Sequence, residues 1–274
     1  MSTVRPAQRG LLFLGCLLAF VRWEPAPYDL FLIIIFLLYA RGLTWKSYQL
    51  VFVVLLGPLL FTHVPALGAA LEVAPERTLY YSLVTLYLAL SSVFFMSLPE
   101  RSVPLLLLGY EVGALLSGLL GVLAFLRIPG LEDLLWGGSR AVAFFKDPNV
   151  FGAFLIPALF LALARLEQGR KFWILPALIL FLGVLVSLSR GAWANFAVAL
   201  LAWWLLRPRK RIWLPLVLLT LAGGVGISVV VMPDNPIVQR LGFMPYDKER
   251  FFTQMEALSV ALTQPLGYGP GLSE

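Results

Sequence analysis

The sequence predicts an all-α fold, a polytopic bundle of transmembrane helices. Of the 274 residues, 60% are hydrophobic, only 13% are charged, and the mean hydropathy is +0.87. These values exclude an ordinary soluble domain. The single cysteine, Cys16, and the single histidine, His63, leave neither a disulfide framework nor a two-histidine metal motif in this sequence. We therefore expect no metal and no cofactor. Without a basic, aromatic surface domain, nucleic acid is not an expected partner either.

Nine apolar stretches, separated by charged residues or by Pro and Gly, give the expected helices in chain order. Most approach the roughly twenty residues that a helix needs to cross a bilayer. The stretches are 10–22, 28–40, 48–67, 78–98, 103–127, 149–165, 172–188, 191–206 and 212–232. The first two are short, and either two tilted spans or one re-entrant pair fits them. We expect residues 1–274 to form a single membrane domain, with helices within 10–232 and the start of a large outer loop at 233–274.

Lysine and arginine are unevenly distributed between the two ends of these nine stretches. With a cytoplasmic N-terminus, the short cytoplasmic loops hold many basic residues and two acidic ones, Glu100 and Glu167. The Arg-Pro-Arg-Lys-Arg loop at 207–211 carries the strongest bias. Cytoplasmic loops of membrane proteins are enriched in basic residues. The sequence therefore predicts a multi-pass protein among membrane lipids, with residue 274 on the outer side.

Arg190 is the residue that most needs an explanation. It lies in Ser-Leu-Ser-Arg-Gly-Ala-Trp (187–193), between two apolar segments and far in sequence from any acidic residue. A guanidinium keeps its charge, and at the hydrocarbon edge it is costly unless an anion meets it. Gly191 would permit a tight reversal that holds Arg190 on short backbone, with Ser189 beside it as a candidate substrate-binding residue. Snorkelling of Arg190 to the interface is the alternative.

A second polar stretch, Lys146-Asp147-Pro148-Asn149, precedes the sixth apolar segment. Asp147 is expected to cap the helix, and Pro148 to occupy its first position. Asn149 would then place its amide at the outer interface, facing any cavity there. We take Asn149 and Lys146 as candidate substrate-binding residues.

The outer loop at the end of the sequence predicts an amphipathic helix. Asp247 is a possible cap, with Glu249 in the first turn and Arg250 at the start of the helix. Its apolar face, which would lie on the membrane, comprises Phe251, Met255, Leu258 and Leu262. Pro-Leu-Gly-Tyr-Gly-Pro-Gly (265–271) follows, and Gly269 and Gly271 in it would let a phosphate or a sugar approach the backbone.

Three motifs in this half of the chain resemble the bacterial O-antigen ligase and O-antigen polymerase family. They are Asp-Pro-Asn-x-Phe at 147–151, Ser-Leu-Ser-Arg-Gly-Ala at 187–192, and Glu-Arg-Phe-Phe-x-x-Met-x-Ala-Leu with the closing Gly-Tyr-Gly-Pro-Gly at 249–271. The resemblance covers about 140–274; the earlier segments agree only in being apolar.

The resemblance implies a glycosyltransferase of the bacterial inner membrane whose donor is a glycan on undecaprenyl diphosphate. The family's two outward arginines correspond to Arg190 and Arg250, although Arg240 is close to the second. The acceptor stays open: lipid A core for a ligase, another glycan repeat for a polymerase, or a protein for an O-oligosaccharyltransferase. The family also has an essential histidine beyond the Gly-Pro-Gly strip. Because the sequence stops at Glu274, we expect that histidine in a continuation of the chain.

Two other classes compete with the enzyme. A small-anion transporter would need ionisable residues along a path near the midplane, and only Glu111 meets that requirement. A structural membrane subunit would not need isolated outward arginines. The alternative for Glu111 is a structural role, as a hydrogen-bonded or neutral acid. His63 is either structural or a substrate contact.

Small residues recurring at Gly109, Gly113, Ser117 and Gly121 predict close helix packing.

Overall fold

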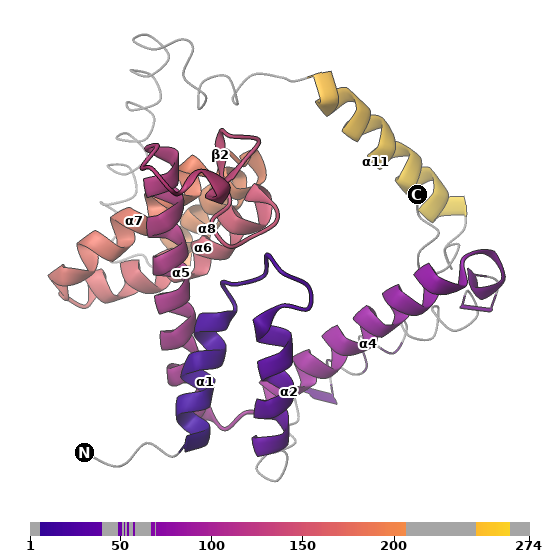
Figure 1. Ribbon diagram of the computed structural model, residues 1–274, viewed down its shortest axis with the longest axis horizontal. Helices are drawn as coiled ribbons and strands as arrows, with labels where there is room; N and C mark the ends of the chain where they lie inside the picture. The colour runs from indigo at the N-terminus through magenta and orange to yellow at the C-terminus, as the bar shows by residue number, and fades with distance from the viewer. Residues whose placement is uncertain are drawn as a thin grey trace. The chain divides into compact units, whose positions relative to one another are not determined.

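Long apolar helices joined by short turns dominate the computed structural model of the chain (Figure 1). The structure describes residues 6–39, 49–50, 52, 54, 57, 67–68, 70–206 and 245–263. The chain divides into two compact units, one of residues 1–37 and 102–243, the other of residues 38–101 and 244–274.

The helices of the first unit follow the expected apolar stretches closely. They are α1 (Pro6–Leu17), α2 (Pro27–Tyr39), α5 (Val103–Phe125), α6 (Pro148–Glu167), α7 (Ile174–Val186) and α8 (Arg190–Leu206), with short 3₁₀ turns η2 (Glu100–Ser102), η3 (Glu132–Leu134) and η4 (Lys171–Trp173). The expected stretch 212–232 lies outside the described residues, and the stretch 48–67 lies mostly outside them.

The loop between α5 and α6 contains a small hairpin that the sequence analysis did not predict. Strand β1 (Leu135–Trp136) pairs antiparallel with β2 (Arg140–Ala141). Gly137 and Gly138 make the turn with φ values of 58° and 68°, which glycine adopts without steric cost.

Helices α1 and α5 lie side by side with their backbones in close contact (Figure 1). A Cβ placed on Gly113 would lie 2.6 Å from the Cys16 carbonyl oxygen, and one on Gly15 would lie 2.7 Å from the Tyr110 nitrogen. Lipid tails are as apolar as leucine, so membrane helices associate largely by such close packing. The small-residue stripe predicted on this segment is therefore confirmed as a packing surface.

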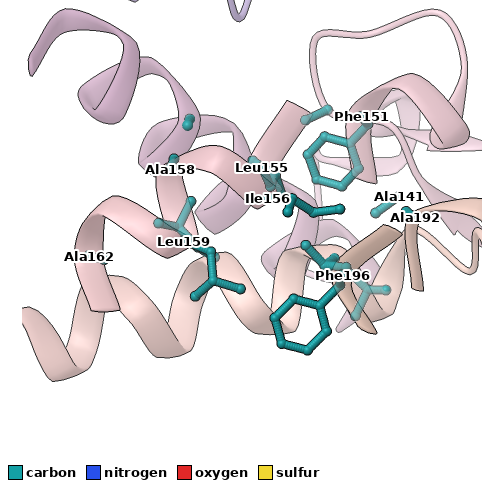
Figure 2. Close-up of a cluster of buried hydrophobic side chains, with 14 of the residues drawn as sticks. Ala141, Phe151, Leu155, Ile156, Ala158, Leu159, Ala162, Ala192 and Phe196 are labelled. Atoms are coloured by element: carbon teal, nitrogen blue, oxygen red, sulfur yellow. The ribbon is translucent and has the colours of Figure 1, made fainter. Parts of the chain in front are cut away.

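Helices α6, α7 and α8 enclose a second cluster of buried apolar side chains (Figure 2). Phe151 and Leu155 of α6 are fully buried there, and Phe196 of α8 packs beside them. Ala141 of the hairpin belongs to the same cluster. The hairpin loop is thus anchored to the helices by its own apolar side chain.

The second unit includes α4 (Pro75–Ser97) and α11 (Pro245–Thr263). The buried Gln49 amide donates to the Ser97 hydroxyl at 2.6 Å near the end of α4. Helix α11 confirms a helix in the last loop, but it begins two residues before Asp247, which therefore lies inside the first turn and not at the cap. Phe251, Met255, Leu258 and Leu262, the expected apolar face, are all exposed.

Within the described part of the chain, three helical segments are long and apolar enough to cross a membrane. They are Pro75–Ser97, Glu100–Phe125 and Pro148–Glu167, and two shorter apolar segments are Pro27–Tyr39 and Lys171–Val186. A helical membrane protein is thereby supported, while the count of nine crossings and the orientation of the termini stay predictions.

Candidate functional site

The hairpin loop carries a buried arginine, Arg140, whose side chain is at the centre of the candidate site. Arg140 is 8% exposed, and its Nε donates a hydrogen bond to the Ser187 carbonyl oxygen at 3.2 Å. Its Nη2 donates to Asn149 Oδ1, also at 3.2 Å. The Trp136 ring centroid lies 5.7 Å from the guanidinium carbon, within the range of a cation–π contact. One guanidinium therefore joins the hairpin, the start of α6 and the turn between α7 and α8.

The turn between α7 and α8 is held by its own serines. The Ser187 hydroxyl donates to the Val184 carbonyl at 2.7 Å and accepts from the Ser189 amide at 3.3 Å. The Ser189 hydroxyl oxygen in turn accepts from the Ala192 amide at 3.2 Å, which makes Ser189 the cap of α8. Both serines are buried, and the predicted substrate-binding residue Ser189 has this capping role in the structure.

The reversal expected at Gly191 is wrong, because the chain turns three residues earlier. Leu188, with φ of 48°, adopts the left-handed conformation that completes the turn. Gly191 lies inside α8, and Arg190 is the first residue of that helix. Arg190 is half-buried and is held at the N-terminal end of α8, directly after the turn that Arg140 contacts.

The Lys146–Asn149 stretch behaves largely as expected. The Asp147 carboxylate accepts from the Asn149 amide at 2.5 Å, and Pro148 is the first residue of α6, so the predicted cap is confirmed. The Asn149 side chain is exposed and turned toward Arg140. Lys146 is exposed and forms an ion pair with Glu24 of the loop between α1 and α2.

Two further contacts fix the hairpin loop to the loop between α1 and α2. Arg22 Nη1 donates to the Asp133 carbonyl at 2.6 Å, and the Phe20 and Phe144 rings stack with centroids 4.5 Å apart.

Backbone amides of Glu132 and Gly130 lower the pKa of the exposed Glu132 carboxyl. Glu132 is therefore ionised at neutral pH, on the hairpin side of the bundle.

Anion binding is the chemistry that this arrangement favours. Arg140, Lys146 and Arg190 all lie near one end of helices α6 to α8. The N-terminus of α8 adds the partial positive charge of the helix dipole. Guanidinium groups suit phosphate oxygens because the planar fork pairs with two of them at once.

The remaining predicted residues are not brought to this site by any described contact. Arg250 lies on α11 of the second unit. Gly269 and Gly271 lie outside the described residues, as do His63 and Arg240.

Glu111, whose partner the sequence did not reveal, forms an ion pair with Arg165. The distance from Glu111 Oε2 to Arg165 Nη1 is 2.6 Å, and the Glu111 side chain is 4% exposed. The Arg165 guanidinium carbon lies 4.0 Å from the centroid of the Trp173 ring. Glu111 is the ninth of the 23 residues of α5, and Arg165 lies near the end of α6, so the pair lies at the end of α6 opposite Asn149, which Arg140 contacts.

Sequence reasoning missed Arg140 as a site residue. The signal was present: Gly137-Gly138 predicts a hairpin turn, and a lone arginine follows it directly before the apolar run 141–145. What the sequence did not contain was the contact with Ser187, 47 residues away.

No family model, no curated protein and no solved structure matches the chain. Inference about function therefore depends on the three motifs and on the geometry around Arg140 and Arg190.

Proposed function

We propose that the protein is a glycosyltransferase that moves a glycan from a polyprenyl diphosphate to an acceptor at the outer face of the bacterial inner membrane. The observation that supports this proposal is that one side chain, Arg140, contacts two of the three motifs. Arg140 contacts Asn149 of the first motif and Ser187 of the second, and Arg190 follows that contact directly. Arg140 thus brings together residues that the chain separates by about forty positions, and we propose that they belong to one cationic site with Arg190.

In this proposal the arginines bind the diphosphate and stabilise it as it leaves. The bond between the sugar and the lipid diphosphate breaks as the sugar's anomeric carbon bonds to the acceptor oxygen, which gives up its proton, and negative charge grows on the departing phosphate oxygen. Fixed cations next to that oxygen lower the free energy of the transition state. Arg190 is proposed for this role, and Arg250 is proposed for it from the resemblance alone. Lys146, Asn149, Gly269 and Gly271 are the proposed contacts of the donor, whereas Ser189 is buried and caps α8.

The transporter alternative loses its main support. It depended on Glu111 as an ionisable residue facing a path, whereas the Glu111 carboxylate is paired with Arg165 and buried. The acceptor in this proposal is lipid A core, a further glycan or a protein.

Arg190→Ala in the full-length protein tests the function. We expect glycan transfer from an undecaprenyl-diphosphate donor in proteoliposomes to fall by about a hundredfold to a thousandfold, the range for losing one transition-state donor. Arg190→Lys should restore little, because an ammonium lacks the bidentate fork. Arg170→Ala is the control, since Arg170 is exposed at the other end of α6. Full activity of the Arg190→Ala variant, inserted at normal levels, would refute the proposal.

A further inference from the structure

We infer that Arg140 is a positioning residue for Arg190: it fixes the turn from which α8, with Arg190 as its first residue, begins. This inference rests on the proposed function only for the chemistry that Arg190 performs. The contacts that carry it belong to Arg140, Ser187 and Asn149.

The Ser187 carbonyl is the group that Arg140 stabilises. Ser187 directly follows the last residue of α7, where carbonyl groups have no partner within the helix. Ser187 is fully buried, so its carbonyl needs a partner from the protein. The Arg140 Nε supplies it at 3.2 Å, and a charged donor makes that hydrogen bond stronger than a neutral one would.

The second Arg140 contact fixes the direction of its guanidinium. The Nη2 bond to Asn149 Oδ1 comes from another edge of the same planar group. Because the guanidinium is rigid, fixing two of its nitrogens fixes the geometry between the first turn of α6 and the α7–α8 turn. A lysine at position 140 has a single nitrogen and does not hold both partners in this way.

Packing at Gly152 shows that the turn has little room to move toward α6. A Cβ on Gly152 would lie 2.6 Å from the Ser187 hydroxyl oxygen and 2.8 Å from the Ala192 Cβ. The turn is therefore enclosed by α6 on one side and tied to Arg140 on another. Replacing Arg140 removes its hydrogen bond to the turn, and we expect the start of α8 to shift with the turn.

A double-mutant cycle separates positioning from direct contact with the donor. Arg140→Gln is combined with Arg190→Ala in the full-length protein, and transfer from the undecaprenyl-diphosphate donor is measured. We expect Arg140→Gln alone to lose roughly tenfold or more, and the double variant to lose no more than Arg190→Ala alone. Losses that multiply would show that Arg140 acts independently of Arg190, and would overturn the inference.

A second measurement does not depend on the enzymatic reaction. In a Cys16→Ala background, Arg190→Cys is labelled with a maleimide, with and without Arg140→Gln. We expect the labelling rate at position 190 to rise by roughly tenfold when Arg140 is replaced, because the start of α8 then opens locally more readily. Arg127→Gln, an exposed arginine of the same loop, is the matched control and should leave that rate unchanged.

The two measurements fail in different ways. If Arg190→Ala keeps full activity, the proposed function fails while the labelling experiment still decides the positioning role. If labelling at position 190 is the same with Arg140→Gln, the positioning role fails whatever the activity is. Arg140→Lys, which keeps the charge, is expected to behave like Arg140→Gln in the labelling experiment. A labelling rate equal to that of the Arg190→Cys protein with Arg140 intact would contradict the role of the planar guanidinium.

Discussion

At the scale of single residues, the first unit carries a buried charged group at each end of its helices. Arg140, at the hairpin end, bridges neutral oxygen atoms of Ser187 and Asn149. At the opposite end, Glu111 is paired with Arg165, and the Arg165 guanidinium stacks on Trp173. Removal from water costs several kcal/mol per ion unless partners offset it. These contacts therefore link α5 to α6 at one end, and α6 to the α7–α8 turn at the other.

The Glu111–Arg165 pair predicts an asymmetry between its two partners. Arg165→Gln leaves a carboxylate that is 4% exposed without its cation, so we expect a loss of about 3 kcal/mol in the free energy of unfolding. Glu111→Gln leaves an arginine that is 23% exposed and stacked on Trp173, so about 1 kcal/mol is expected. The double variant should resemble Glu111→Gln alone. Thermal unfolding in detergent measures all three, and equal, additive losses would contradict the pairing.

Residue-level prediction succeeded where the cause is local. Asp147 and Pro148 were predicted as the start of α6 because capping depends only on neighbours in sequence. Arg140 was missed because its role depends on Ser187, which only the folded chain brings near. For Glu111, the sequence indicated a partner without identifying it, since many pairings of the helices were open.

At the scale of elements, the lengths of the apolar stretches and the charged, Pro and Gly residues between them were enough to place most helices. The expected stretch 149–165 corresponds to α6 at Pro148–Glu167, and the stretch 191–206 to α8 at Arg190–Leu206. The hairpin was not predicted, because strands of two residues have no periodicity to detect. The turn before α8 was misassigned to Gly191, because glycine is the usual residue at positive φ and Leu188 adopts it here.

Helix α5 offers two glycines whose replacement by alanine should have opposite effects. On Gly113 a Cβ would lie 2.6 Å from the Cys16 carbonyl oxygen, so Gly113→Ala forces α1 away and should cost about 1–3 kcal/mol. On Gly118 the nearest atoms are 3.7 Å away, an ordinary contact. Gly118→Ala should therefore stabilise the helix by up to about 1 kcal/mol.

The measurement is the midpoint of thermal unfolding of each purified variant beside the parent protein. Because both changes add one methyl group to the same helix, Gly118→Ala controls for the intrinsic preference of alanine. Equal shifts in the two midpoints would mean that α1 does not pack on α5 at Gly113.

At the scale of the whole first unit, described contacts fix the order in which helix ends meet. The middle of α5 contacts the end of α6 through Glu111 and Arg165, and the end of α6 contacts the end of α8 through Glu167 and Trp203. At the other end, Gly152 of α6 meets the α7–α8 turn. Helices α6, α7 and α8 therefore alternate in direction, and α6 separates the loop at 126–147 from the turn at 168–173.

That alternation predicts which positions are reached from each side of a membrane. Ser139, in the hairpin turn, and Gln168, after α6, are both exposed. In a Cys16→Ala background, Ser139→Cys should react with a membrane-impermeant maleimide in intact spheroplasts, because the basic residues 207–211 predict that the α8 end is cytoplasmic. Gln168→Cys should react only after the membrane is permeabilised. If both positions react from one side, the alternation of α6 to α8 is wrong. If the two sides are exchanged, the helix order stands, and Arg190 would face the cytoplasm, where a donor on the outer leaflet does not reach it.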